Sequence, residues 1–390
     1  MNFKEMKKKF IFFTILIFFF PITIILWLHF GIIISSETLR LNKSNIEIFN
    51  PNKCYKHSCI KGYERYEWAK KFYYEYDAIP YEFTGYTMFK KKKYNGEFLN
   101  IIGEDNIRFT SLPEKFDKNL KAYIFGGSVA WGYGVKDDLT FASLFAQKYN
   151  IKTYNYAQIG WNSSQSLIEL TRLISRNEKL DIVIFFEGYN DAVSLCNVNQ
   201  NENYFNSGLE EIYNDKIYNR MRPDSFENFF SVFRKFVEVV RYKFIKDYHN
   251  KKTLKGLIKN NYDCHINSRK NERAADHMIN NWLQAKTLVE NNGGKFFVIL
   301  QPVSFFDNTK TDHVLEFSKI QNKDQSLSKS VVSFYNLVSE KLNSKYFFLD
   351  LKDVFDNKFD YIYVDLSTHL FPEGYSEIIN AFDSRFKNEF

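Results

Sequence analysis

The chain has 390 residues, of which 45% are apolar and 18% aromatic, and its net charge is +7. This length is enough for one large or two ordinary domains with a sizeable core. The charge is mild for a nucleic-acid-binding protein and no nucleic-acid motif is present, so nucleic acid is not an expected partner.

The N-terminus has the pattern of a membrane anchor. After a lysine-rich start at 1–9, which we expect to be cytoplasmic, residues 10–34 are almost wholly apolar. As a helix this stretch would be about 37 Å long, enough to cross a bilayer core. The lysines favour a cytoplasmic N-terminus, although Arg40 and Lys43 beyond the span oppose that bias. A cleaved signal peptide is the alternative, but the stretch is long and lacks a clear cleavage site.

Residues 35–118 form a membrane-proximal region rich in Tyr and Lys. Its apolar and β-branched content predicts short strands in the run 94–102 and in the segment 106–110. We therefore expect this region to be structured.

Four cysteines fit an exported protein. Cys54 is close enough in sequence to bridge to Cys59, and Cys196 could pair with Cys264, although three pairings are possible in principle. With His57 between them, Cys54 and Cys59 also offer a metal-site pattern, but a second pair of ligands at zinc-site spacing is missing. A disulfide or two free thiols is the preferred interpretation, and no metal is expected.

From residue 119 the pattern changes to alternating strands and helices. Helices are predicted over about 140–149 and 164–175, and apolar strands over 121–125, 152–156, 181–186, 295–300 and 345–350. Such alternation predicts an α/β domain in which a parallel sheet is covered on both faces. We place this domain at 119–390, with a helical insertion at about 195–270.

The insertion contains an amphipathic segment. Between residues 226 and 244, phenylalanines and valines recur at helical spacing, with Lys and Arg between them. One interpretation is a helix that packs on the sheet with its charges in solvent. The other is a cap over a site, or a basic face that rests on anionic lipid or polymer.

Glycines and polar residues follow three of the predicted strands. Ser128 follows two glycines after the first strand, Gly160 follows the second, five residues after Asn155, and Asn190 follows the third. Ligands of open parallel sheets bind at the carboxyl ends of the strands, so we expect these loops to converge. By itself, Gly-Gly-Ser is also typical of a strand-to-helix turn with a capping serine, and no phosphate-loop motif is present.

A histidine near the C-terminus completes a candidate acyl-transfer site. Asp365 and His369 stand just before a helix-start signal at Pro372. An imidazole with a nearby carboxylate can act as a general base, whereas the alternative is a surface histidine beside a turn aspartate. The carboxylates of Glu187 and Asp350 are interpreted as structural, and Asp191 is expected to cap the segment that follows it.

Together these residues carry a family resemblance. The segment 121–385 resembles the SGNH (GDSL-type) hydrolases, serine esterases and acyltransferases with a flavodoxin-like three-layer α/β/α sandwich around a parallel sheet. Ser128, Gly160, Asn190 and His369 each match one of the four family blocks. The resemblance implies that Ser128 is the nucleophile, that His369 is the base, and that the oxyanion hole comprises the N–H groups of Ser128 and Gly160 and the side chain of Asn190. The stretch 81–110 also looks like the lead-in of membrane-anchored members.

Two positions depart from the family pattern. Gly127 stands where many members have Asp, and Asp365 lies four residues before His369, where the family usually has three, with Leu366 at the expected place. Either a one-residue bulge restores the contact between Asp365 and His369, or the site works as a Ser–His dyad.

The expected protein is a single-pass membrane protein with an extracytoplasmic (periplasmic or cell-surface) serine esterase domain. It would act through an acyl-serine, without metal or organic cofactor, on O-acetyl groups of cell-surface glycans. One alternative is an O-acyltransferase that uses the same site to modify a surface polysaccharide. Another is a catalytically inactive carbohydrate-binding or assembly factor, for which the irregular spacing of Asp365 and His369 is the main support.

Overall fold

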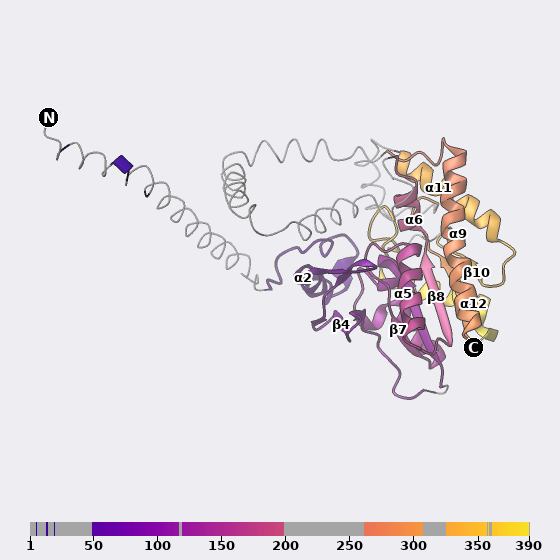
Figure 1. The fold of residues 1–390 in the computed structure, drawn as a ribbon. Helices are drawn as coiled ribbons and strands as arrows, with labels where there is room; N and C mark the ends of the chain where they lie inside the picture. Colours follow the sequence, from indigo (N-terminus) through magenta and orange to yellow (C-terminus); the bar gives the residue numbers. More distant parts are fainter. Residues whose placement is uncertain are drawn as a thin grey trace. The chain divides into compact units, whose positions relative to one another are not determined.

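The computed structural model describes residues 5, 13, 14 and 19 and, from residue 49 on, 49–116, 119–198, 261–306, 325–356, 358 and 361–389. The described residues from Phe49 onward belong to one compact unit (Figure 1). Nearly all of the predicted anchor at 10–34, and the whole amphipathic segment at 226–244, lie outside the described residues. Within the described part of the chain, no helix combines the length and apolar character needed to span a bilayer.

The described residues form an eight-stranded, mostly parallel sheet in the order β10-β9-β8-β6-β7-β5-β4-β3. Its parallel strands are β6 (Lys121–Gly126), β7 (Lys152–Asn155), β8 (Ile182–Glu187), β9 (Lys295–Leu300) and β10 (Phe348–Asp350). Numbered along the chain, their order is 2-1-3-4-5, which is the flavodoxin-like arrangement. The predicted α/β class with a parallel sheet is therefore confirmed.

Helices cover both faces of the sheet (Figure 1). One face carries α4 (Phe141–Tyr149) and α12 (Pro372–Phe386), and the other carries α5 (Ser163–Ser175), α9 (Ser268–Asn291) and α11 (Ser326–Leu342). Alternation along the buried strands divides the core, since Ile182 and Ile184 face the first set of helices while Val183 and Phe185 face the second. This gives the three layers.

Local sequence signals fix where the principal helices begin. Thr140 caps α4 by accepting a hydrogen bond from the Ser143 N–H, and Asn162 forms a capping box with Gln165 at the start of α5. Helix α12 begins at Pro372, as predicted. The remaining short helices are α3 (Ser128–Trp131), α6 (Tyr189–Leu195), η1 (Tyr63–Arg65), η2 (Asp137–Leu139) and η3 (Lys387–Glu389).

The segment that precedes the five parallel strands contributes to the same sheet. It contains α2 (Ala69–Ala78), a two-stranded hairpin of β1 (Tyr81–Thr84) and β2 (Met88–Lys91), and the short strands β3 (Tyr94–Asn95), β4 (Asn100–Ile102) and β5 (Ile107–Arg108). Strands β3 to β5 continue the large sheet in antiparallel fashion beyond β7. The short strands between residues 94 and 108 and the five parallel strands therefore share one sheet.

The run 94–102 holds two strands with a turn between them, β3 and β4. The reason is the buried carboxylate of Glu75, which accepts hydrogen bonds from the N–H groups of Glu97, Phe98 and Leu99. A continuous strand would need these N–H groups for a neighbouring strand, so the chain turns here instead.

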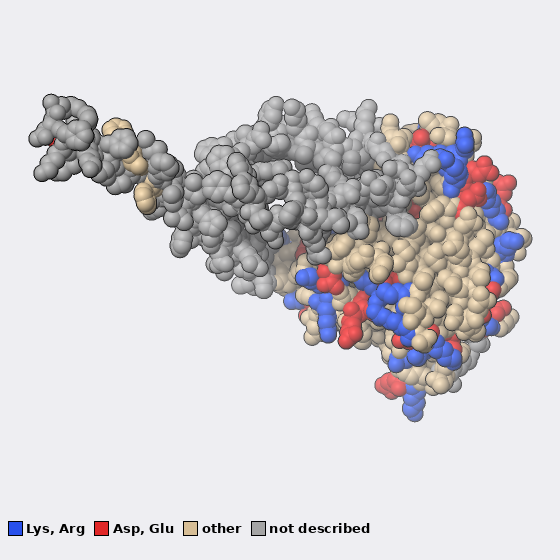
Figure 2. Space-filling model, viewed as in Figure 1, with Lys and Arg blue, Asp and Glu red and all other residues tan. Residues whose placement is uncertain are grey.

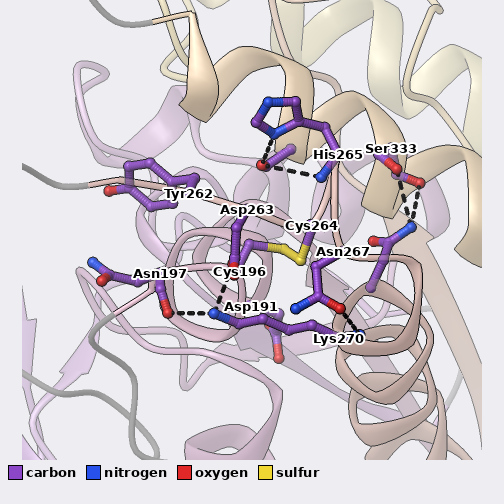
Figure 3. Close-up of a disulfide and its surroundings, with 12 residues drawn as sticks. Asp191, Cys196, Asn197, Tyr262, Asp263, Cys264, His265, Asn267, Lys270 and Ser333 are labelled. Carbon is purple, nitrogen blue, oxygen red and sulfur yellow. Dashed lines mark hydrogen bonds and ion pairs between the residues drawn. A yellow bond between two sulfur atoms is a disulfide. The ribbon is translucent and has the colours of Figure 1, made fainter.

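Both disulfides considered from the sequence are present. Cys54 pairs with Cys59, and Cys196 pairs with Cys264. The second bond joins the end of α6 to the segment before α9, where Asn197 and Tyr262 also form an antiparallel bridge (Figure 3). The two ends of the predicted insertion are thus fastened to each other.

The surface of the described part carries mixed charges. On the face shown in Figure 2, basic and acidic side chains lie interspersed around a broad area of uncharged residues. Many charged side chains of the described residues are paired, for example Lys341 with Asp276 at 2.6 Å. Exposed pairs of this kind contribute little to stability.

Candidate active site

Ser128 lies directly after the end of a central strand. Strand β6 ends at Gly126, beside Phe186 of β8, and Gly126 has a φ of +142°. A Cβ atom at this position would lie 2.1 Å from the Phe186 carbonyl oxygen, so only glycine lets the chain turn here. The turn places Ser128 as the first residue of α3, at the carboxyl end of the sheet.

Three side chains form one hydrogen-bonded line. The Ser128 Oγ lies 2.8 Å from the Nε2 of His369, although 241 positions separate the two residues. The Nδ1 of His369 donates to the Oδ2 of Asp365. With its proton on Nδ1, the neutral imidazole presents an unprotonated Nε2 to the serine hydroxyl. This is the arrangement that a serine nucleophile and its general base require.

The four-residue spacing between Asp365 and His369 is accommodated by a tight turn. The Val364 N–H donates to the His369 carbonyl at 2.8 Å, which closes a loop between the two. Inside it, the Asp365 Oδ1 accepts hydrogen bonds from the N–H groups of Ser367 and Thr368, at 2.9 and 3.1 Å. Of the two arrangements that the sequence allowed, the structure contains the one in which Asp365 contacts His369.

The Asp365 carboxylate is electrostatically stabilised in this turn. Burial alone would raise its pKa, but attraction to the His369 imidazolium and the hydrogen bonds from His369 and Ser367 hold the pKa of Asp365 well below its usual range. A carboxylate that stays ionised can orient the imidazole and stabilise an imidazolium.

The predicted oxyanion donors lie around the same serine. Neither the Ser128 N–H nor the Gly160 N–H donates to an acceptor among the described residues. One N–H of the Asn190 amide donates to the Trp161 carbonyl at 2.7 Å, which leaves its second N–H for a ligand. A Cβ on Gly127 would lie 2.4 Å from the Asn190 Nδ2. The departure at Gly127 is therefore matched by the close approach of Asn190, while the roles of these donors stay a prediction.

The loop that carries Gly160 is fastened to the segment before residue 118. The buried side chain of Gln158 accepts from the Lys91 N–H at 3.2 Å and donates to the Asn106 carbonyl at 2.9 Å. The Trp161 indole donates to the Phe89 carbonyl at 2.9 Å. No local sequence signal points to Gln158 or Trp161, because their partners are 50 or more positions away.

Other polar residues near the site support its backbone. Asn155 donates to the Ala130 carbonyl at 3.0 Å, which holds α3 against β7. Asp191 accepts hydrogen bonds from the N–H and hydroxyl of Ser163. The sequence predicted that Asp191 caps the segment that follows it. In the structure its carboxylate accepts from Ser163, the first residue of α5, so the prediction missed this role at the start of α5.

The two strand-end carboxylates have structural partners. The Glu187 side chain is buried and accepts from the Trp282 indole at 2.8 Å, and Asp350 pairs with Lys352 at 2.7 Å. Burial raises the pKa of Glu187, and the charge of Asp191 raises it further. Neither carboxylate contacts Ser128 or His369.

Two further ring side chains near His369, those of Tyr133 and His57, were not identified from the sequence. The Tyr133 ring lies 4.4 Å from the imidazole of His369, centroid to centroid. The Tyr133 hydroxyl lies 3.4 Å from the Nδ1 of His57, in the loop closed by the first disulfide. Burial lowers the pKa of His57. The one sequence signal that could have placed Tyr133 near the site is its position five residues after Ser128.

Comparison with known proteins gives similarity to solved structures alone. No protein-family model and no curated protein matches the chain. A protein assigned to the G-D-S-L lipolytic family from Desulfitobacterium hafniense is 11% identical with a TM-score of 0.37, over 68% of this chain and 99% of that one. A carbohydrate acetylesterase from Sinorhizobium meliloti is 12% identical with a TM-score of 0.34, over 70% of this chain and 100% of that one. At these values the function has to be argued from the site itself.

Proposed function

We propose that this chain is a serine ester hydrolase of the SGNH type that works through an acyl-serine. The observation that carries the proposal is the continuous line from the Ser128 hydroxyl through His369 to Asp365, at the carboxyl end of the sheet. The second imidazole nitrogen of His369 meets a carboxylate, and the whole line lies where ligands of open parallel sheets bind.

The geometry supports a two-step reaction. The Ser128 Oγ attacks the ester carbonyl carbon while the His369 Nε2 takes its proton, and Asp365 stabilises the imidazolium. The carbonyl oxygen becomes an oxyanion near the N–H groups of Ser128 and Gly160 and the amide of Asn190, each such donor being worth about 2.7–4 kcal/mol in the transition state. His369 then protonates the departing alcohol. In the second step His369 deprotonates a water molecule that attacks the acyl-serine carbonyl carbon; the bond from that carbon to the Ser128 Oγ then breaks, the acid leaves, and His369 returns the proton to the Ser128 Oγ.

The contact between Asp365 and His369 also argues against the alternative of a catalytically inactive binding or assembly factor. That alternative depended on an irregular spacing, which the turn at 365–369 accommodates. An acyltransferase would use the same residues, with a sugar hydroxyl in place of water.

The proposed substrate is an O-acetyl group on a cell-surface glycan, and the proposed location is extracytoplasmic, on an anchor at 10–34. The two disulfides support an oxidising compartment. The lysine-rich start followed by an apolar stretch supports the anchor.

Labelling with a serine-directed fluorophosphonate tests the proposal on the full-length, detergent-solubilised chain. Wild type is expected to label, Ser128→Ala to lose the label and His369→Ala to label far more slowly, while Thr171→Ala, on the exposed face of α5, should match wild type. A folded wild-type chain that does not label would overturn the enzyme. If acetyl from p-nitrophenyl acetate appears on an added oligosaccharide rather than in acetate, the transferase is selected.

Membrane fractionation tests the anchor separately. The full-length chain is expected to stay with membranes after extraction at alkaline pH, and its C-terminal part should be digested by protease added from the extracytoplasmic side. Release into the supernatant would exclude an uncleaved anchor.

A further inference from the structure

The imidazole of His369 packs against a tyrosine from the turn that follows the nucleophile. The ring centroids of His369 and Tyr133 are 4.4 Å apart, and Tyr133 is 6% exposed. The Tyr133 N–H donates to the Ser128 carbonyl at 2.9 Å. On either side of it stand Gly132 and Gly134, with φ angles of +90° and +92°. The turn after Ser128 therefore carries this ring back to the general base.

The segment before residue 118 encloses the rest of the Tyr133 ring. The ring centroids of Tyr76 and Tyr73 lie 5.0 and 5.8 Å from that of Tyr133, with their planes steeply inclined to it. The Tyr63 hydroxyl donates to the carbonyl of Gly134, the residue after Tyr133, at 2.9 Å. These three enclosing tyrosines are buried. The place of the Tyr133 ring is therefore set by protein contacts.

One polar side chain in this enclosure comes from the loop that the first disulfide closes. His57 lies between Cys54 and Cys59, and its Nδ1 is 3.4 Å from the Tyr133 hydroxyl. Burial lowers the pKa of His57 below its ordinary value of 6.5, so the imidazole is uncharged at neutral pH. An uncharged imidazole has one nitrogen that accepts, whereas both nitrogens of an imidazolium donate. His57 can therefore accept the hydrogen bond of the Tyr133 hydroxyl.

The 54–59 loop holds His57 in place with a strained backbone. Lys56, the residue before His57, has a φ of +44°, in the left-handed region that residues with a Cβ rarely adopt. The bond between Cys54 and Cys59 closes the loop around it, and the Lys56 ammonium pairs with Asp77 of α2 at 3.0 Å. Strained residues persist where surrounding contacts impose them, and they cluster at functional sites. The strain beside His57 therefore points to a function for this loop.

The position of the Tyr133 ring matters to the chemical step. Asp365 holds one imidazole nitrogen of His369, and the Tyr133 ring stops the imidazole from tilting about that hydrogen bond. A displacement of about 1 Å in a reacting group can lower the rate by about 10²-fold. Because the ring contacts the base, its loss should lower kcat rather than weaken substrate binding.

We propose that the loop closed by Cys54 and Cys59 supports the general base, in that His57 positions the Tyr133 ring and this ring positions His369. Tyr133 and His57 are positioning residues, since both act through His369. The inference rests on the proposed function, and it gives a part in the reaction to a loop that lies ahead of the five parallel strands.

A double-mutant cycle on the full-length chain tests this order of contacts, with p-nitrophenyl acetate as substrate. Tyr133→Leu is expected to lower kcat about tenfold or more, with KM within about twofold of wild type. His57→Ala should lower kcat about threefold or more. The variant with both changes should be no slower than Tyr133→Leu, because His57 acts only through that ring. Tyr133→Phe, which keeps the ring, should recover most of the kcat lost in Tyr133→Leu.

Two matched variants control for general damage to the fold. His265→Ala removes another half-buried histidine, and Tyr123→Leu removes another buried tyrosine, in β6. Both should keep the kcat of wild type, even where the urea midpoint falls. If Tyr133→Leu does not fold, the cycle is run with Tyr133→Phe. This change and His57→Ala cut the same hydrogen bond, so the variant with both should be no slower than His57→Ala.

Three results would overturn the positioning role while leaving an active esterase. The first is a His57→Ala variant with the kcat of wild type. The second is a double variant in which the two single losses multiply, since His57 would then act independently of Tyr133. The third is a raised KM with unchanged kcat in Tyr133→Leu, which would place that ring against the substrate. A wild-type chain that neither hydrolyses the ester nor labels with fluorophosphonate would remove the enzyme and this role together.

Discussion

At the scale of single residues, His369 is held on three sides. Its Nδ1 donates to Asp365, its Nε2 meets the Ser128 hydroxyl, and its ring lies against Tyr133. These contacts fix both the tautomer and the orientation of the imidazole before substrate arrives. Preorganisation of this kind is what makes a base effective, because no reorientation is needed during the reaction.

Asp365→Asn is expected to lower kcat for p-nitrophenyl acetate by about 10²–10⁴-fold with little change in KM. The amide can still accept the N–H groups of the turn, but it no longer selects the productive tautomer of His369. Asp276→Asn, on the exposed side of α9, should leave kcat unchanged. A loss of less than threefold in Asp365→Asn would instead indicate a Ser–His dyad.

Gly127→Ala is expected to displace the Asn190 amide, because the new methyl group would lie 2.4 Å from its nitrogen. If Asn190 donates to the oxyanion, kcat should fall by up to about 10²–10³-fold, the cost of losing one such donor. Steady-state kinetics and a thermal unfolding curve would separate this from misfolding. Gly85→Ala provides the matched control, since nothing lies within 4 Å of the added group. Equal activity of the two variants would contradict the role of Asn190.

At the scale of elements, the hairpin of β1 and β2 supports the site from outside the parallel sheet. Its backbone bonds to Gln158 and Trp161 in the loop that carries Gly160, and a Cβ atom on Gly160 would lie 3.6 Å from the Phe89 ring. The parallel strands therefore bring the reacting groups to one edge, while the hairpin holds the loop that carries Gly160.

Glu187, at the end of β8, makes the stability of the fold depend on pH. Burial raises the pKa of this carboxyl above its usual value of 4.5, so the folded state holds the proton more tightly than the unfolded one. The corresponding stability is fully present below pH 4.5 and is lost as pH rises through the folded pKa. Between pH 5 and 8, the free energy of unfolding of wild type should fall relative to that of Glu187→Gln, by up to about 1.4 kcal/mol per pH unit.

Urea unfolding at several pH values, followed by tryptophan fluorescence, measures this difference. The glutamine keeps an acceptor for the Trp282 indole but cannot ionise. Glu340→Gln, at an exposed position on α11, should run parallel to wild type. Parallel curves for wild type and Glu187→Gln would show that the Glu187 carboxyl does not titrate differently in the folded state.

At the scale of the molecule, the second disulfide joins two elements on either side of a long insertion. It links the end of α6, the helix that contains Asn190, to the segment that leads into α9 (Figure 3). Beside it, Lys270 donates to the Asn197 carbonyl and pairs with Asp263. These contacts keep the end of α6 and the start of α9 together, although the 62 residues 199–260 lie between them in the sequence.

Loss of this disulfide should destabilise the chain more than loss of the first. On the loop-entropy model, the sequence separation of 68 between Cys196 and Cys264 corresponds to about 4 kcal/mol, and the separation of 5 between Cys54 and Cys59 to about 2 kcal/mol. The paired variants Cys196→Ala/Cys264→Ala and Cys54→Ala/Cys59→Ala, unfolded in urea without reductant, measure the difference. The opposite order would mean that native-state contacts outweigh the chain entropy.

Features that depend on local signals could be predicted from the amino-acid sequence. Strands alternating with helices indicated the α/β class, because buried parallel strands read as short apolar runs. Helix starts near residues 140 and 372 followed from local signals, because caps and an N-terminal proline act within one turn. The order of Ser128, Gly160, Asn190 and His369 along the chain indicated a site, because loops after parallel strands share one edge of the sheet.

Tertiary structure alone decided the contacts between distant segments. It decided that Asp365 reaches His369 despite the added residue, since this depends on how the turn closes between Val364 and His369. It decided that Gln158 holds the loop of Gly160 to the segment before residue 118, and that the Tyr133 ring lies against His369. Such contacts have no local period or motif, so their physical origin lies in the shape of the assembled core rather than in any stretch of sequence.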